Sequence, residues 1–578
     1  MAKKELPGVV PAHDLTVDLL VIGSGTGMAA ALAAHEQGLS VLIAEKTSYV
    51  GGSTARSGGA FWVPGSSILT EFGGRRSDPL PAARDYIGAV VGDSAPAERG
   101  RAFVDNGAAT VEMLRRTTPM KFLWAKGYSD YHPEKIGGRA EGRTCECRPL
   151  DASVLGADRG RLRPGVMKAS IPIPVTGADY KWMNLLARKP LKALPRIFRR
   201  VLQGIGGMAI GREYLAGGQA LAAGMYAGVL EAGIPVWTET SLVRLIEDGD
   251  GRVTGAVLRQ HEREVEVTAK RGVVLAAGGF DHNMEWRRKY QSERLMEHAS
   301  LGSEGDTGDA IAIAQNLGAG LASMHEAWWF PAFAPLPGQP PMVMLAERSM
   351  PGSFIIDQDG RRFVNESMDY MSFGQAVLAR ENDGRPIEEM WIVFDQHYRN
   401  SYILAGAVFP RQPIPQEWYD AGIAHRATNP DQLAQLIGVP ADTFRQTFDR
   451  FNEMAASGTD TQFGRGESAY DRYYGDPTVR PNPNLRALQK DTLYAVKVVL
   501  SDLGTCGGVV ADEHARVVRE DGSVIDNLYA IGNTAANAFG KSYPGAGATI
   551  GQGLVFGFIA ARHAAAQNRT VNEHARGV

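Results

Sequence analysis

The order of apolar and polar positions near the start of the chain predicts a strand, a turn, a helix and a second strand. Residues 17–22, VDLLVI, form a short apolar run of strand-forming residues, and the turn GSGTG follows at 23–27. Residues 28–37 are rich in alanine and have helical character, and a second apolar run at 40–44 ends at Glu45. This alternation is typical of the first β-α-β unit of a doubly wound α/β fold.

The glycine turn has the parts that a dinucleotide cofactor requires. Glycines let the backbone approach a pyrophosphate, the start of the next helix offers free N–H groups to the phosphates, and an acid accepts from ribose hydroxyls. Glu45 lies 22 residues after Gly23, which suits that acid. The spelling departs from G-x-G-x-x-G, because Gly27 comes one residue early and Met28 takes the expected place. The surrounding elements still predict a Rossmann-like dinucleotide site.

Later glycine-rich segments favour FAD over NAD. GGSTARSGG at 51–59 can run beside an extended cofactor and donate N–H and O–H groups to it. An apolar strand at 272–277 ends in two glycines, and another at 528–531 leads into Gly532 and Asn533. Three separated glycine-rich contacts suit a long, buried cofactor. No second G-x-G-x-x-G indicates a separate NAD site.

Composition excludes several classes of protein. The 578 residues carry 61 Lys and Arg against 64 Asp and Glu, a net charge of −3, which argues against a nucleic-acid-binding protein. Three cysteines cannot form a disulfide framework, and with no histidine cluster beside them we expect no metal site. No apolar run is long enough for a membrane span, and residues 1–15 lack the apolar core of a signal peptide. These features predict a cytoplasmic location.

One segment, residues 181–212, is basic and amphipathic. It carries eight Lys and Arg and no acid, interleaved with leucine and other apolar residues. We favour a solvated helical cap on the flavin domain, interrupted by Pro190 and Pro195. The alternative is peripheral contact with an anionic membrane surface.

Motifs spread over nearly the whole chain carry a family resemblance. GGSTARSGG (51–59), YDRYYGDP (470–477) and the YPGxGxTIG pattern at 543–551 are specific at family level. Further matching segments are GYSDYHPE (127–134), AAGGF (276–280), GDTGDA (305–310), EAWW (326–329), PGSFIID (351–357), RRFVNESMDY (361–370) and DLGTCGG (502–508). The chain resembles the 3-ketosteroid Δ1-dehydrogenases, within the fumarate reductase/succinate dehydrogenase flavoprotein superfamily.

The resemblance implies tightly bound, non-covalent FAD and a Rossmann-like flavin domain in two pieces, residues 1–327 and 494–578. An α+β catalytic domain at 328–493 is inserted between them, and this part of the chain is indeed richer in proline and aromatic residues. The expected cofactor residues are Gly23, Gly25, Thr26, Gly27, Glu45, Gly51, Gly52, Ser53, Thr54, Ser57, Gly58, Gly59, Gly278, Gly279, Asp309, Gly532, Asn533, Thr549 and Ile550.

The same resemblance assigns roles in removing a C2 proton and a C1 hydride from a 3-ketosteroid. Tyr543 and the backbone N–H of Gly547 match the two donors to the C3 carbonyl. Tyr370 matches the base that takes the C2 proton, and Tyr131 matches the tyrosine hydrogen-bonded to that base. Tyr128 falls where the family places an aromatic pocket wall. A tyrosine pKa near 10 must be lowered or assisted for such a base.

Several alternatives stay open at this point. Trp328 and Trp329 either line an apolar steroid slot or belong to the core. A fumarate-reductase-like reductase of unsaturated acids would need an arginine proton donor and a cationic pocket, whereas this chain offers tyrosines and tryptophans. A Δ4-(5α)-3-ketosteroid dehydrogenase and a non-catalytic flavin-binding scaffold are further alternatives. A quinone is a candidate electron acceptor, since no NAD site is visible.

Overall fold

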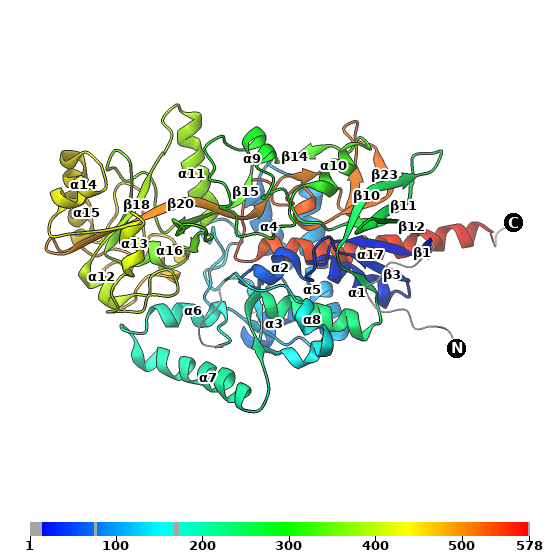
Figure 1. Cartoon of the computed structure of the whole chain (residues 1–578), viewed down its shortest axis with the longest axis horizontal. Helices are drawn as coiled ribbons and strands as arrows, with labels where there is room; N and C mark the ends of the chain where they lie inside the picture. Colours follow the sequence, from blue (N-terminus) through cyan, green and yellow to red (C-terminus); the bar gives the residue numbers. More distant parts are fainter. Residues whose placement is uncertain (1–13, 74–77, 167–172, 576–578) are drawn as a thin grey trace.

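A six-stranded sheet forms the centre of the flavin domain (Figure 1). The computed structural model describes residues 14–73, 78–166 and 173–575. Residues 1–15, from which we expected no signal peptide, lie almost wholly outside the described residues. Five strands run parallel in the order β23-β13-β2-β3-β9, and β22 pairs antiparallel at one edge. The strands are β2 (Leu19–Ile22), β3 (Val41–Ala44), β9 (Val236–Trp237), β13 (Val273–Leu275), β22 (Arg516–Val518) and β23 (Val524–Ala530).

Small residues explain how helices cover this sheet closely. The predicted helix is α1 (Gly27–Glu36), whose first eight residues are all buried and mostly alanine. It packs against α8 (Gly217–Glu231) and α17 (Ala548–Ala575). Strands β2 and β3 are buried along their whole length, which is why they read as unbroken apolar runs. A second sheet packs beside the first, with strands β1 (Leu15–Val17), β10 (Thr240–Glu247), β11 (Val253–Gln260) and β12 (Arg263–Ala269).

The catalytic domain is built on another sheet, in the order β16-β15-β20-β18-β17, with β19 also paired to β20. Its first long strand begins at Ala327, next to the expected boundary. The second expected boundary, at residue 494, falls inside β20, which hydrogen-bonds to β15 and β18 and so belongs to this sheet. The strands are β15 (Ala327–Phe333), β16 (Met342–Val343), β17 (Ser353–Asp357), β18 (Met390–Asp395), β19 (Ala424–Ala427) and β20 (Leu493–Thr505).

Buried ion pairs hold the segment that precedes helix α11 (Tyr370–Asn382). Arg362 donates to both carboxylate oxygens of Glu366, at 2.7 and 2.8 Å, and also to Asp460 at 2.7 Å. Arg465 reaches the same Glu366 at 3.2 Å. These groups have fully buried side chains, so each charge requires its partner. Two residues of the RRFVNESMDY motif, Arg362 and Glu366, therefore help to hold the segment that leads to Tyr370.

The basic segment forms a helical hairpin at the lower edge of Figure 1, α6 (Gly177–Asn184) and α7 (Pro190–Ala209). Pro190 does not interrupt the segment; it occupies the first turn of α7, where its missing N–H costs no helical hydrogen bond. Pro195 lies inside the continuous helix. The hairpin is fastened by Arg200, whose Nε donates to Asp179 at 2.7 Å. No helix among the described residues is long and apolar enough to cross a membrane.

Candidate active site

Three tyrosines from distant parts of the chain meet in one buried cluster. The ring centroids of Tyr131 and Tyr370 lie 5.4 Å apart, those of Tyr131 and Tyr543 5.1 Å apart, and those of Tyr370 and Tyr543 5.3 Å apart. All three pairs meet edge to face, the arrangement that aromatic quadrupoles favour. These are the three tyrosines to which the resemblance gives chemical roles, and they lie side by side.

The loop that carries Tyr131 is fastened to the segment that carries Tyr543. The backbone N–H of Tyr131 donates to the carbonyl of Pro544 at 3.1 Å, and the hydroxyl of Tyr86 donates to the same carbonyl at 2.6 Å. Neighbouring Asp130 is fully buried between Arg143 and the indole N–H of Trp62. The positions of Tyr131 and Tyr543 are therefore coupled through the backbone.

Tyr370 occupies the first position of helix α11, directly after its cap. The carboxylate of Asp369 accepts from the backbone N–H of Ser372 at 2.9 Å and so caps the helix. A helix N-terminus carries partial positive charge, which favours a phenolate over a phenol at Tyr370. The buried pairs of Glu366 hold the preceding turn, so the ring has little freedom.

Gly547 ends the loop before helix α17, in a position that only glycine can take. Its φ is +88°, and a Cβ there would lie 2.2 Å from the carbonyl oxygen of Ala60. Its backbone N–H approaches the phenol oxygen of Tyr543 and acts to lower the pKa of that phenol. The phenol of Tyr543 and the backbone N–H of Gly547 are therefore neighbours within the cluster.

Burial sets the protonation of the cluster. It raises the pKa of Tyr543 above its usual value, which keeps the phenol protonated and able to donate near neutral pH. It raises the pKa of Tyr370 well above 10 as well, and nearby Tyr543 and Tyr128 act in the same direction. The hydroxyl of Tyr131 acts in the opposite direction and lowers the pKa of Tyr370. That hydroxyl is buried and has no hydrogen-bond partner among the described residues, so it is free to act on Tyr370 when a substrate is bound.

The two tryptophans have different surroundings, because successive residues of a strand face opposite sides. The ring centroid of Trp328 lies 4.7 Å from that of Tyr543, and its indole N–H donates to Asn533 at 3.0 Å. Trp329 packs instead against Gly374 of helix α11, whose added Cβ would lie 2.1 Å from the Cβ of Trp329. Trp328 belongs to the cluster, whereas Trp329 is a core residue.

Sequence reasoning missed three further tyrosines, which the 470–474 motif brings to the same place. The Tyr470 ring centroid lies 4.6 Å from that of Tyr131. Tyr473 stacks on Tyr128 at 4.5 Å with ring planes 6° apart, and Tyr474 meets Tyr128 edge to face at 5.5 Å. The signal was present, since YDRYY is dense in tyrosine, but a single sequence does not show which rings face the cluster.

The expected cofactor residues gather at one edge of the parallel sheet. Gly23 follows β2, Glu45 follows β3, Gly278 comes shortly after β13, and Gly532 comes shortly after β23. The carboxyl ends of parallel strands form the edge where doubly wound folds bind nucleotides. The other expected residues lie in the turn between β2 and α1, at the start of α1, in helix α2 (Gly52–Arg56) and the loop around it, in the first turn of α17, and after β13 and β23. They are Gly25, Thr26, Gly27, Gly51, Gly52, Ser53, Thr54, Ser57, Gly58, Gly59, Gly279, Asn533, Thr549 and Ile550.

The chemistry at this edge fits FAD. Gly23 has φ +107°, and a Cβ there would lie 2.2 Å from the carbonyl oxygen of Ala276, so the turn admits close backbone approach only as glycine. The N-terminus of α1 starts at Gly27 and offers phosphates its free N–H groups. The carboxylate of Glu45 accepts from the hydroxyls of Ser24 and Thr47 at 2.6 and 2.7 Å. Both hydroxyls can rotate, so Glu45 remains able to accept from a ribose.

The acid expected near this edge, Asp309, is exposed, whereas two other acids are buried there. Asp309 lies at the surface, 48% exposed in its side chain, and pairs with Lys46 at 2.6 Å. Asp306 is buried instead, accepts from the hydroxyl of Ser53 at 2.6 Å, and lies where a Gly278 Cβ would touch it. Its pKa is raised to about 7, chiefly by burial. Asp281 is buried beside it, and its Oδ1 has no hydrogen-bond partner among the described residues. Both acids lie at the glycine-rich edge of the sheet where we expect FAD, which we call the cradle, and the sequence singled out neither of them.

Comparisons with known proteins agree with this geometry. The family model described as "FAD binding domain" matches residues 18–550. The 3-oxosteroid 1-dehydrogenase of Mycolicibacterium smegmatis is 42% identical over 564 residues, 95% of this chain and 97% of that protein. The chain belongs to the 3-oxosteroid 1-dehydrogenase family. Members of this family are FAD-dependent oxidoreductases, so the predicted family, the α/β fold with an inserted catalytic domain and the FAD cofactor are confirmed.

Two further proteins, one a solved structure and one a curated relative, are similar to this chain over nearly its whole length. The crystal structure of 3-ketosteroid Δ1-dehydrogenase from Sterolibacterium denitrificans, in complex with 1,4-androstadiene-3,17-dione, has a TM-score of 0.88 and 34% identity, covering 96% of this chain and all of that one. The 4-oxocyclohex-2-ene-1-carboxylate 5-dehydrogenase of Sinomonas cyclohexanicum is 33% identical over 98% of this chain and 96% of its own. The Mycolicibacterium and Sterolibacterium relatives favour Δ1 chemistry over the Δ4-(5α) and fumarate-reductase-like alternatives.

A substitution in the glycine turn tests the cradle without using activity. Gly23→Ala should abolish FAD binding, because the new Cβ would collide with the Ala276 carbonyl. Gly38→Ala is the matched control: Gly38 also has positive φ, at +82°, but has nothing within 4 Å of its added Cβ. The ratio of flavin absorbance to protein absorbance in the purified variants measures the outcome. Full flavin content in Gly23→Ala would remove this turn from the cofactor site.

Proposed function

We propose that this chain dehydrogenates the C1–C2 bond of a 3-ketosteroid, with Tyr370 as base and with Tyr543 and Gly547 as donors to the C3 oxygen. The convergence of Tyr131, Tyr370 and Tyr543 supports this most directly. Because C2 is bonded to C3, the base that takes the C2 proton must lie close to the groups that donate hydrogen bonds to the C3 carbonyl oxygen. FAD, when bound at the cradle, supplies the hydride acceptor.

Tyr543 and Gly547 stabilise the negative charge that develops on the C3 oxygen as the C2 proton leaves. A carbon acid beside a ketone is weak, and donors held in place before the reaction lower this barrier most. Burial suits Tyr543 to the role, since its raised pKa keeps the donor proton on the phenol. Gly547 contributes a backbone N–H that has no flexible side chain to order.

Tyr370 takes the C2 proton on its phenol oxygen, with Tyr131 as a positioning partner. In this buried site an unassisted phenolate would be costly. The hydroxyl of Tyr131, which acts to lower the pKa of Tyr370, and the N-terminus of α11 both favour that phenolate. Ionisation of Tyr370 thus depends on groups from two chain segments.

The aromatic surroundings support an apolar, ring-shaped substrate. Trp328, Phe330 and Tyr128 surround the three tyrosines, with the Phe330 ring 5.1 Å from Tyr370. The Sinomonas relative is named for a smaller keto acid. Comparing turnover of 4-androstene-3,17-dione with that of 4-oxocyclohexanecarboxylate, with an artificial electron acceptor, separates the two substrate classes. Preference for the keto acid would overturn the steroid assignment.

We further propose that a membrane quinone takes the electrons from the reduced flavin and that α7 lies on the membrane surface. Seven large apolar side chains on or directly after α7 are exposed. Those on the helix itself recur every three or four residues and so form one stripe. They are Leu191, Leu194, Phe198, Leu202, Ile205, Met208 and Ile210, which we call the apolar stripe. Leu191 is 90% and Phe198 63% exposed.

This exposure favours the membrane interpretation over a solvated cap. A cap would expose polar side chains and bury its leucines, whereas α7 turns its leucines outward and buries Ala193, Arg200, Gly204 and Gly207. An apolar face flanked by cations is the arrangement of helices that lie in the membrane interface. Steroids and quinones both dissolve in the acyl region, so a protein on that surface would meet both.

Loss of the phenol of Tyr543 should slow catalysis and leave the cofactor in place. In Tyr543→Phe we expect kcat to fall by about 10²–10³, the usual cost of removing one such donor. Flavin content should equal that of the wild type, because the ring still packs against Trp328. Steady-state kinetics with 4-androstene-3,17-dione measure the effect, with Tyr214→Phe, a tyrosine outside the cluster, as the matched control. A change of only a few-fold would exclude Tyr543 as the principal donor.

Hydrogen exchange at C2 isolates the base from the later steps. Tyr370→Phe should abolish exchange of the C2 protons into deuterated water. Tyr131→Phe should leave a slower enzyme, whose kcat rises at higher pH than in the wild type, because the variant lacks the hydroxyl that acts to lower the pKa of Tyr370. Wild-type exchange in Tyr370→Phe would exclude that residue as the base. An unshifted profile in Tyr131→Phe would assign Tyr131 a packing role.

Vesicle binding tests the apolar stripe. The variant Leu194→Ser/Phe198→Ser/Leu202→Ser should lose at least tenfold in affinity for vesicles of phosphatidylcholine and phosphatidylglycerol, measured by co-sedimentation. The matched control, Leu436→Ser, removes an exposed apolar side chain elsewhere, 45% exposed, and should bind normally. Equal binding by both variants would contradict docking through α7. Dimerisation through the stripe in analytical ultracentrifugation would assign it to a second copy instead.

A further inference from the structure

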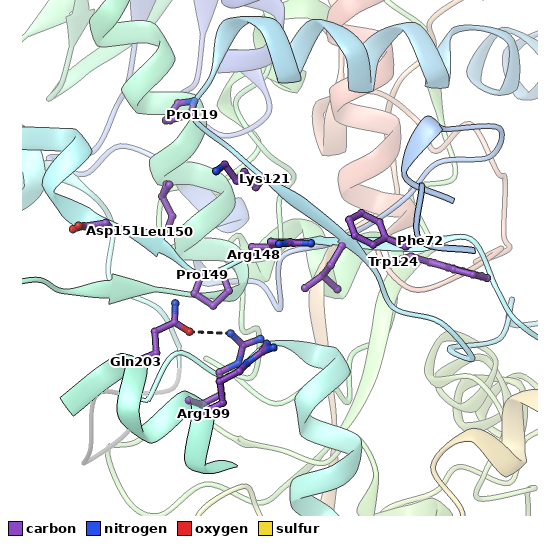
Figure 2. Close-up of a pocket in the computed structure, with 12 residues that line it drawn as sticks. Phe72, Pro119, Lys121, Trp124, Arg148, Pro149, Leu150, Asp151, Arg199 and Gln203 are labelled. Carbon is purple, nitrogen blue, oxygen red and sulfur yellow. Dashed lines mark hydrogen bonds between the residues drawn. The ribbon is translucent and has the colours of Figure 1, made fainter. Parts of the chain in front are cut away.

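A cavity of about 690 Å³ lies beside α7 (Figure 2). Its walls come from α3 (Ser67–Gly73), from β5 (Phe122–Trp124) and the residues before it, from the turn after β6 (Thr144–Cys147), from β7 (Leu150–Asp151), and from α7. None of the clustered tyrosines lines it. Its lining combines cations with Phe72, Leu123 and Trp124.

Three cations at the cavity lack carboxylate partners within the described part of the chain. They are Lys121, Arg148 and Arg199, which we call the cation trio. Arg200, also at the cavity, is already paired with Asp179 and donates to Gln203 (Figure 2). Asp151, the acid among the lining residues, faces Arg212 at 3.5 Å.

The cavity lies beside the same helix that carries the apolar stripe. Lys192, Arg196, Arg199 and Gln203 are spaced by four, three and four residues, so they form a second, polar stripe along α7. This stripe lies between the apolar stripe and the buried side of the helix. Two of its members, Arg199 and Gln203, line the cavity. When an interfacial helix sinks its apolar face to the acyl boundary, its cationic flank lies at the level of the headgroups.

We propose that this cavity binds the phosphate headgroup of an anionic phospholipid from the membrane on which α7 lies. Guanidinium and ammonium groups are the usual partners of phosphate. The apolar wall of Phe72, Leu123 and Trp124 suits the glycerol and upper acyl chain that accompany that phosphate. The volume is in the range of pockets that hold small ligands. The inference rests on the proposed docking of α7 and is independent of the catalytic assignment.

Two triple variants separate a headgroup site from general attraction to negative charge. The cavity variant is Lys121→Gln/Arg148→Gln/Arg199→Gln. The flank variant, Lys189→Gln/Lys192→Gln/Arg196→Gln, removes the same charge from α7 and its N-terminal end without lining the cavity. General electrostatics predicts a similar loss for both, roughly fivefold in vesicle affinity per charge. A headgroup site predicts a further loss of at least tenfold in the cavity variant, at equal flavin content and melting temperature. Equal losses would overturn the proposal.

A membrane-free titration identifies the ligand. Isothermal titration calorimetry of the holoenzyme with dihexanoyl-phosphatidylglycerol below its micelle concentration should give one site, lost in the cavity variant and kept in the flank variant. Dihexanoyl-phosphatidylcholine should bind at least tenfold more weakly. Equal affinity for inorganic phosphate would show a free-anion site and overturn the lipid assignment, as would absence of binding. Because the short-chain lipid needs no bilayer, this result does not depend on the fate of the apolar-stripe variant or of the tyrosine variants.

Discussion

The carbonyl of Pro544 accepts two hydrogen bonds, and the active-site geometry depends on them. One comes from the backbone of Tyr131 and the other from the hydroxyl of Tyr86. They tie the loop at 127–132 to the glycine-rich loop that precedes α17. Helix α17 packs on α1 in the flavin domain. The same two hydrogen bonds therefore help to fix the position of the tyrosines relative to the edge of the sheet where we expect the cofactor. A shift of either loop would move Tyr131 or Tyr543 away from the other two tyrosines of the cluster.

Several buried ion pairs surround this junction, and they hold the segments that carry the tyrosines in place. Arg143 is buried between Asp78 and Asp130 behind the first loop, and Arg362, Glu366 and Arg465 are buried before Tyr370. Such networks add little net stability compared with apolar packing, but removing one member is costly. The protein thus holds its tyrosines with interactions that tolerate few alternative arrangements. A rigid frame is what preorganised donors require.

Local sequence patterns account for the expected cofactor residues, which the fold gathers at one edge of the sheet, but not for the arrangement of the tyrosines. The glycine turn, Glu45 and the later glycine pairs are local signals, and parallel-strand geometry places them together. The roles of Tyr131, Tyr370 and Tyr543 came from family motifs, because tyrosine spacing alone says nothing of tertiary contact. The sequence pointed to Asp309, which is exposed, and did not show that Asp306 is buried at the same edge, since burial is decided by distant segments. The expected boundary at 494 falls inside β20 for a similar reason, as the sheet that a strand joins depends on non-local pairing. The sequence of α7 showed an amphipathic segment, but not whether its apolar face is buried or exposed.

The proposed docking of α7 on a membrane would also change what substrate concentration means for this protein. An enzyme held in the interface samples steroid in two dimensions, at the mole fraction it reaches within the leaflet. Adding inert lipid at constant steroid would then dilute the substrate and slow turnover, although the bulk concentration stays the same. Apparent Michaelis constants for such an enzyme depend on the ratio of steroid to lipid, so values obtained with dispersed steroid describe a different encounter from the one at a bilayer.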